Sequence, residues 1–263
     1  MINSFHIFLT DKKEIPVSTI APRNELLREL LSVPGMADYL LPELKIVPFT
    51  VNQVLYEQGD KIDYIYFPLD SVVSGLAIME DGTTMETSMV GREGLVGVST
   101  ILSSGVSRQW IWVTVGGNAV QLETRLLDKI FVQNEATLKM LLRSYRSLVT
   151  QVSQRCVCNT RHTIPERLCC WLLMIHDRVG GTNLKLTQET IASRVGARRA
   201  GITVAAGMLQ EMQAIEYRRG QLHIRSRELL EATVCECYEI MKVDFNRVPG
   251  GAVEKFLNAP LDD

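Results

Sequence analysis

Histidine and cysteine are absent from residues 26–135 of the 263-residue chain. The only one of the 4 histidines before this region is His6, and no cysteine precedes Cys156. These two residue types are the usual protein ligands of catalytic metals, haem and iron–sulfur clusters. We therefore expect no enzyme of the metal-dependent type, no N-terminal iron–sulfur cluster, no metal and no cofactor.

Long hydrophobic runs are also absent. The longest apolar stretch is LCCWLLMI at residues 168–175, whereas a membrane-spanning helix needs about 18 or more apolar residues. The N-terminal sequence MINSFHIFLTDKKEIPV has no basic start before an apolar run, as a secretory signal would. We expect a cytoplasmic protein without a membrane partner.

The 6 cysteines include no C-x-x-C spacing and occur as the pairs Cys156/Cys158, Cys169/Cys170 and Cys235/Cys237. Neighbours one or two positions apart on a helix point to different faces, so no pair is expected to hold a metal. Reduced, partly buried thiols are the favoured interpretation. A redox role for Cys156 and Cys158 stays open.

The net charge of −2 is unevenly distributed. Residues 178–227 contain nine basic and three acidic side chains, so this segment carries 9 − 3 = +6 and the rest −2 − 6 = −8. A basic segment on an acidic body is typical of a polyanion-binding module. The basic residues are Arg178, Lys185, Arg194, Arg198, Arg199, Arg218, Arg219, Arg225 and Arg227.

Short apolar runs separated by turn residues fill the region between residues 47 and 122. Asp81-Gly82 is a strong hairpin turn signal within it. Strands of this length and spacing predict an all-β sandwich or barrel. The expected strands are 64–67, 72–78, 84–90 and 110–115.

The apolar period changes to that of a helix between residues 136 and 159. The stripe has successive spacings of 4, 3, 4, 3 and 4, which is the seam of a coiled coil. A helix lying only on its own domain is the alternative, but a strict heptad of this length favours the same helix of a second subunit. The predicted dimer interface is Leu138, Leu142, Tyr145, Val149, Val152 and Cys156.

A second helix is signalled by Thr163 and Glu166, which have the spacing of a capping box, with Pro165 tolerated in the first turn. We expect it to run over 167–178 and to stop at the glycines 180–181. A new domain opens here.

The sequence LTQETIASRVGARRAGITVAAGMLQEMQAI, residues 186–215, predicts two short helices joined at Gly196. Thr187 can cap the first, and the glycine permits the positive φ of a tight turn. Ala192 is small enough for the helices to cross closely, as a helix-turn-helix requires. The expected apolar faces are Ile191, Ala192 and Val195, then Ile202, Ala205 and Leu209.

Two short strands around Arg219-Gly220 follow, which makes the motif a winged helix. An ordinary helical hairpin with a solvated charged face explains the apolar positions equally well. It does not explain why the second helix and the wing are both rich in arginine, so we favour DNA binding. Arg198, Arg199 and Thr203 are expected to face bases, and Gln188, Arg218 and Arg219 the backbone.

This order of parts resembles the Crp/Fnr superfamily of bacterial transcription regulators over residues 26–238. The most specific segments are YEQGDKIDYIYF, SVVSGLAIMEDG and LTQETIASRVG. The resemblance implies an α+β chain with a cyclic-nucleotide-binding-like β jelly roll, a long dimerisation helix and a C-terminal winged helix-turn-helix. The expected units are an N-terminal extension (1–25), the jelly-roll sensor (26–134), the dimerisation helix (135–160), the DNA-binding domain (161–238) and a tail (239–263).

Two departures from the family limit what the resemblance implies. Members that read the common operator have Arg-Glu-x-x-x-Arg, whereas residues 199–204 here are RAGITV, so a different operator is expected. Cyclic-AMP binders have Gly-Glu-x-Ala/Gly followed by Arg-Ser/Thr-Ala. The matching residues Gly97, Val98 and Ser99, then Arg108 and Trp110, disfavour cyclic AMP, although Arg108 could meet another anion.

The favoured function is a homodimeric, sequence-specific transcription regulator. Its expected partners are double-stranded DNA with two-fold symmetry, a second copy of the chain and RNA polymerase. The β domain either binds a small-molecule effector of unknown identity or senses nothing small at all. A cyclic-nucleotide-responsive module acting on a partner protein is the main alternative, and a jelly-roll metalloenzyme is a third. The arginines of residues 186–224 weigh against the second interpretation, and the missing histidines weigh against the third.

Overall fold

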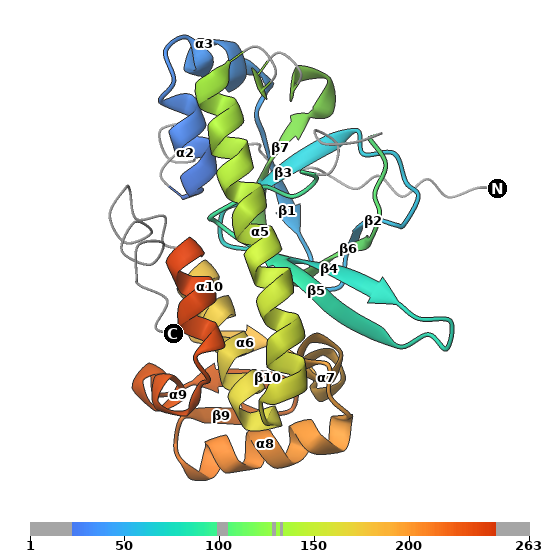
Figure 1. The fold of residues 1–263 in the computed structure, drawn as a ribbon, viewed down its shortest axis with the longest axis vertical. Helices are drawn as coiled ribbons and strands as arrows, with labels where there is room; N and C mark the ends of the chain where they lie inside the picture. Colours follow the sequence, from blue (N-terminus) through green and yellow to red (C-terminus); the bar gives the residue numbers. More distant parts are fainter. Residues whose placement is uncertain (1–22, 99–104, 128–129, 132–133, 246–263) are drawn as a thin grey trace, which may run out of the picture.

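The computed structural model describes residues 23–98, 105–127, 130–131 and 134–245. A β-rich domain and a helical domain lie at opposite ends of one long helix, α5, which runs beside both (Figure 1). None of the helices in these residues combines the length and the apolar character that crossing a membrane requires.

The N-terminal domain is built from two antiparallel sheets, with strand orders β1-β7-β3 and β2-β6-β4-β5. The four strands expected from the apolar alternation are present as β3, β4, β5 and β6, with at most one residue of difference at an end. The strands are β1 (Lys45–Phe49), β2 (Val54–Tyr56), β3 (Tyr64–Pro68), β4 (Val72–Ile78), β5 (Thr84–Val90), β6 (Trp110–Val115) and β7 (Gly117–Glu123).

Short helices cover the end of this domain. Asn24 begins α2 by accepting the backbone N–H of Leu27 at 2.9 Å, and Leu26, Leu27 and Leu30 fill the core below. The helical pieces are α2 (Glu25–Leu31), α3 (Met36–Leu40), η1 (Leu41–Glu43) and η2 (Thr124–Leu126). The leucines pack with Ile65 and Phe67 of β3, so the helices and the sheet share one core.

The long helix α5 spans Glu135–Arg161, in agreement with the heptad pattern. Asn134 caps its first turn by accepting the backbone N–H groups of Ala136 and Thr137. After His162, the helix α6 (Ile164–Val179) begins with the expected capping box between Thr163 and Glu166. It ends at Gly180, whose φ of 65° supplies the left-handed C-cap.

The C-terminal domain consists of helices around a three-stranded sheet of order β8-β10-β9. The strand β8 was not expected from the sequence because it is only three residues long. The elements are β8 (Asn183–Lys185), α7 (Gln188–Val195), α8 (Arg199–Glu211), β9 (Ile215–Arg218), β10 (Gln221–Ile224), α9 (Arg227–Thr233) and α10 (Cys237–Phe245). The expected limit of the DNA-binding domain at residue 238 lies inside α10, which packs along α5.

Candidate nucleic-acid interface

The helix-turn-helix is made by α7 and α8. Thr187 caps α7 by accepting the backbone N–H of Thr190 at 3.0 Å, and Gly196 makes the turn with a φ of 68°. This positive φ favours glycine, and a Cβ here would also lie 2.7 Å from Met85 Cε, at the flexible end of that side chain. Ala192 is only 4% exposed, which agrees with its expected place between the helices.

The first turn of α8 presents the residues expected to read DNA. Arg198 is the N-cap and Arg199 the first helical residue, and both side chains are exposed. The Thr203 hydroxyl lies 3.1 Å from Gln188 Oε1 and from the Arg199 carbonyl oxygen. Gln188 and Thr203 therefore form one polar surface across α7 and α8. In Figure 1 α8 lies at the outer end of the molecule, away from the β domain.

The wing is a tight hairpin of β9 and β10. Arg218 pairs with Gln221, so Arg219 and Gly220 form a two-residue loop with φ values of 50° and 76°. Positive φ at both positions defines a type I′ turn, which favours Asn-Gly or Gly-Gly. Placing an arginine in the left-handed region costs roughly 1–2 kcal/mol. The loop therefore holds an exposed guanidinium at a local energetic cost.

Four of the nine basic residues counted in the sequence have internal partners. Arg178 Nε lies 2.9 Å from Glu93 Oε1 and is buried, and Arg194 is buried beside Glu86. Two more form ion pairs within the C-terminal half of the chain: Arg225 pairs with Glu216, and Arg227 pairs with Asp177. The charge available to a polyanion is therefore smaller than the sequence count indicates. It rests on Lys185, Arg198, Arg199, Arg218 and Arg219.

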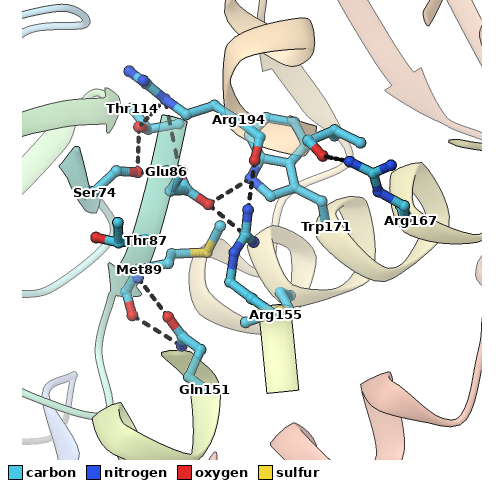
Figure 2. Close-up of polar contacts among 12 residues, drawn as sticks. Ser74, Glu86, Thr87, Met89, Thr114, Gln151, Arg155, Arg167, Trp171 and Arg194 are labelled. Carbon is cyan, nitrogen blue, oxygen red and sulfur yellow. Dashed lines mark hydrogen bonds and ion pairs between the residues drawn. The ribbon is translucent and has the colours of Figure 1, made fainter. Parts of the chain in front are cut away.

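A buried ionic cluster joins the helix-turn-helix to the β domain, and Figure 2 shows Glu86 of β5 at its centre. Glu86 Oε1 accepts the indole N–H of Trp171 at 3.0 Å and lies 3.2 Å from Arg155 Nη1. Glu86 Oε2 accepts the Ser74 hydroxyl at 2.5 Å and lies 3.8 Å from Arg194 Nε. One carboxylate therefore contacts α5, α6, α7 and a neighbouring strand.

Hydrogen bonds from α5 and α6 also hold the C-terminal end of α7 beside the cluster. Arg155 Nη2 donates to the Arg194 carbonyl at 2.5 Å, and Arg167 Nη2 donates to the Gly196 carbonyl at 2.7 Å. The Arg194 side chain is 3% exposed, and this burial lowers the pKa of its guanidinium. The members of the cluster are spread over residues 74–194, so no local pattern in the sequence indicates it.

The expected effector residues do not form one pocket within the described part of the chain. Gly97 adopts a φ of 97° and lies against Ile62 and Ile65. Val98 packs on the core of the β domain near α5, whereas the Arg108 side chain is exposed. Ser99 falls outside the described residues. The pocket therefore stays a prediction.

The predicted dimer stripe lies on the surface of α5. Leu138, Leu142, Tyr145 and Val149 are 38%, 48%, 41% and 46% exposed, which is unusual for large apolar side chains. Cys156 is exposed as well, and Val152 is half-buried. The described residues of the single chain leave this stripe largely uncovered.

Comparison with known proteins agrees with this architecture. Residues 166–233 match the Crp-like helix-turn-helix domain family. The global nitrogen regulator of Nostoc sp. (strain PCC 7120) is 21% identical over 186 residues, covering 67% of this chain and 83% of the regulator. That of Synechococcus elongatus is 20% identical over 191 residues, covering 69% and 86%.

Solved structures show the same fold. FixK2 from Bradyrhizobium japonicum superposes with a TM-score of 0.62 at 15% identity, covering 73% of this chain and 98% of that chain. A CRP-family transcriptional regulator from Thermus thermophilus gives a TM-score of 0.59 at 15% identity, covering 71% and 95%. The two nitrogen regulators and the Thermus thermophilus protein are named as regulators. The chain therefore carries a Crp-like helix-turn-helix domain at residues 166–233, and it resembles the Crp/Fnr-type transcription regulators in sequence and in fold.

Proposed function

We propose that the protein is a homodimeric regulator that binds a specific, two-fold symmetric DNA site through α8 and the wing. The observation that carries this proposal is the position of Arg198, Arg199, Arg218 and Arg219. All four are exposed at one end of the molecule, and none forms a salt bridge with another of the described residues. Arg219 in addition occupies a backbone conformation that costs energy, which is typical of a functional position.

The two groups of arginines have different roles in this proposal. Arg199 lies at the N-terminus of the recognition helix, where a guanidinium can bind guanine O6 and N7 together. Arg198 and Thr203 are its neighbours on the same surface. Arg218 and Arg219 extend from a rigid hairpin and contact phosphates, as does Gln188 at the start of α7.

Dimerisation through α5 explains the exposed stripe. Two copies of α5 packed along Leu138, Leu142, Tyr145, Val149 and Val152 would bury side chains that the single chain leaves in water. A two-fold dimer also presents two recognition helices, as a palindromic site requires. We expect the protein to act in the cytoplasm, with RNA polymerase as a further partner.

The effector, in this proposal, is not a cyclic nucleotide. The turn at Gly97 has Val98 where a ribose-binding carboxylate is expected, and the Arg108 side chain is exposed. The β domain contacts α7 through the Glu86 cluster. An effector that binds the β domain would change DNA affinity by altering this contact.

Selection of genomic fragments with the purified protein tests the proposal. We expect enrichment of a motif with two-fold symmetry whose half-sites lie about one helical turn, near 10 base pairs, apart. The matched control is a variant with Arg198 and Arg199 both replaced by alanine, which should enrich no motif. Fragments without a common motif would contradict sequence-specific binding and favour a module that acts on a partner protein.

A further inference from the structure

Four potential metal ligands meet where α5 approaches the C-terminal helices. Cys158 lies in the last turn of α5 and His162 at its C-cap, whereas Cys235 precedes α10 and Cys237 is its first residue. Their sulfur and ring nitrogen atoms all lie within 4.8 Å of one another. Segments 75 residues apart in the sequence therefore supply one cluster.

Two of the distances between these atoms are close to those around a single tetrahedral ion, and none of the others exceeds 4.8 Å. Zn–S bonds of about 2.3 Å and Zn–N bonds of about 2.0–2.1 Å place two sulfurs about 3.8 Å apart and a sulfur and a nitrogen about 3.5 Å apart. Cys158 Sγ lies 3.6 Å from Cys235 Sγ. Cys237 Sγ lies 3.4 Å from His162 Nδ1.

The surroundings of the cluster have the features of a metal site. The three cysteines are at most 6% exposed, and the His162 side chain is 13% exposed. His162 Nε2 lies 3.3 Å from a carboxylate oxygen of Glu236, the partner that orients a ligating histidine in many metal sites. Gln154 Nε2 donates to Cys237 Sγ at 3.1 Å, and such a donor stabilises a thiolate.

The local structure explains why the sequence did not reveal this cluster. The premise that paired cysteines share a helix fails for Cys235 and Cys237, because Cys235 lies in the turn before α10. Cys158 and His162 are four residues apart on α5 and therefore share one face. The members come from two different cysteine pairs and a histidine, so no single spacing indicates a site.

We propose that Cys158, His162, Cys235 and Cys237 bind one Zn²⁺ ion in a tetrahedral site that fastens α10 to the end of α5. Three thiolates and one imidazole are a ligand set of structural zinc sites. The ion would fix the last turn of α5 against the C-terminal domain. Its ligand His162 directly precedes Thr163, the N-cap of α6. It would therefore set the joint between the dimer helix and the DNA-binding domain.

Metal titration of the reduced, full-length protein tests the proposal directly. After treatment with a chelator, we expect the wild type to bind one Co²⁺ per chain, with thiolate-to-cobalt charge transfer and the strong visible bands of tetrahedral cobalt. One equivalent of Zn²⁺ should then displace the cobalt. Absence of these bands, octahedral cobalt spectra, or a preparation that holds several irons with labile sulfide would each overturn a mononuclear zinc site.

Variants assign the ligands. Cys235→Ser and Cys237→Ser should each weaken Co²⁺ binding by more than about 100-fold, and Glu236→Gln by roughly 10-fold. The matched control is Cys169→Ser, which removes an equally buried thiol outside the cluster and should bind within about 2-fold of the wild type. Equal losses for Cys169→Ser and Cys237→Ser would contradict the assignment. The cobalt spectrum of the wild type decides the proposal even where a variant fails to fold.

Discussion

Replacing Glu86 with glutamine removes the negative charge at the centre of the buried cluster, and the new side chain has nearly the same shape as the old one. The side chain is 0% exposed, and Arg155 and Arg194 lie 3.2 and 3.8 Å from its oxygens. With an effective dielectric constant of about 20, these pairs attract by about 5 and about 4 kcal/mol before the cost of desolvation. Glu86→Gln leaves both guanidinium groups buried without this counter-charge.

Breaking a buried ion pair in this way costs about 3–5 kcal/mol of folding free energy. For a chain of this size, each kcal/mol lowers the melting temperature by about 2–4 °C, so a fall of about 6–20 °C is expected. Thermal unfolding followed by tryptophan fluorescence is a suitable assay, because the Trp171 indole donates directly to Glu86. Trp110 and Trp112 of β6 contribute to the same signal, so it reports on the β domain as well as on the cluster.

The control is Glu216→Gln, which removes the partner of Arg225 on the surface of the wing sheet. These side chains are 51% and 49% exposed, and such pairs contribute about 0–1 kcal/mol. We expect a change of at most about 4 °C. If Glu86→Gln melts within the same range as Glu216→Gln, the cluster does not hold the two domains together as described.

Three further predictions concern the dimer, the pH dependence and the effector. Leu142→Glu combined with Val149→Glu should give monomers by analytical ultracentrifugation at micromolar concentration, whereas Thr150→Glu, outside the stripe, should leave the dimer intact; a monomeric wild type would show the stripe has another role. Burial and the nearby Arg227 lower the pKa of His176 below 6.5, so the folded state binds its proton less tightly than the unfolded state does. The contribution of His176 to the free energy of unfolding is complete above about pH 6.5 and is lost as the pH falls toward the folded pKa. In His176→Gln, the free energy of unfolding measured by urea denaturation should therefore change less with pH across that window. An unchanged pH dependence would exclude this cause. Calorimetry should detect no cyclic AMP or cyclic GMP binding, and micromolar affinity for either would contradict our interpretation of the 97–110 segment.

The elements that sequence analysis predicted well are those with local signals. The apolar alternation of β4, the heptad of α5 and the capping box at Thr163 each lie within a short window, and the structure shows all three elements. The turn at Gly196 was equally predictable because few residues other than glycine adopt its φ.

The parts that escaped prediction depend on contacts between distant segments. Arg194 adds to the positive charge of residues 178–227, yet it is buried against Glu86, more than 100 residues away. In the sequence the cysteines form three close pairs, whereas the structure places Cys158 Sγ 3.6 Å from Cys235 Sγ, which belongs to a different pair. Charge counts and spacings do not show which side chains the fold brings together.

The central claim is that Arg199 reads a base and that the wing arginines contact phosphates. Fluorescence anisotropy with the selected site and with random DNA, over a range of salt concentrations, tests it most directly. Arg199→Ala should lose about 1–3 kcal/mol per half-site on the selected DNA and much less on random DNA. Arg218→Ala with Arg219→Ala should weaken binding to both, reducing the salt slope by about one unit per contact, or roughly four for a dimer. Arg225→Ala is the matched control, because this arginine is paired with Glu216, and it should change neither quantity. Equal losses on both DNAs for Arg199→Ala, or an unchanged salt slope for the wing variant, would contradict the account.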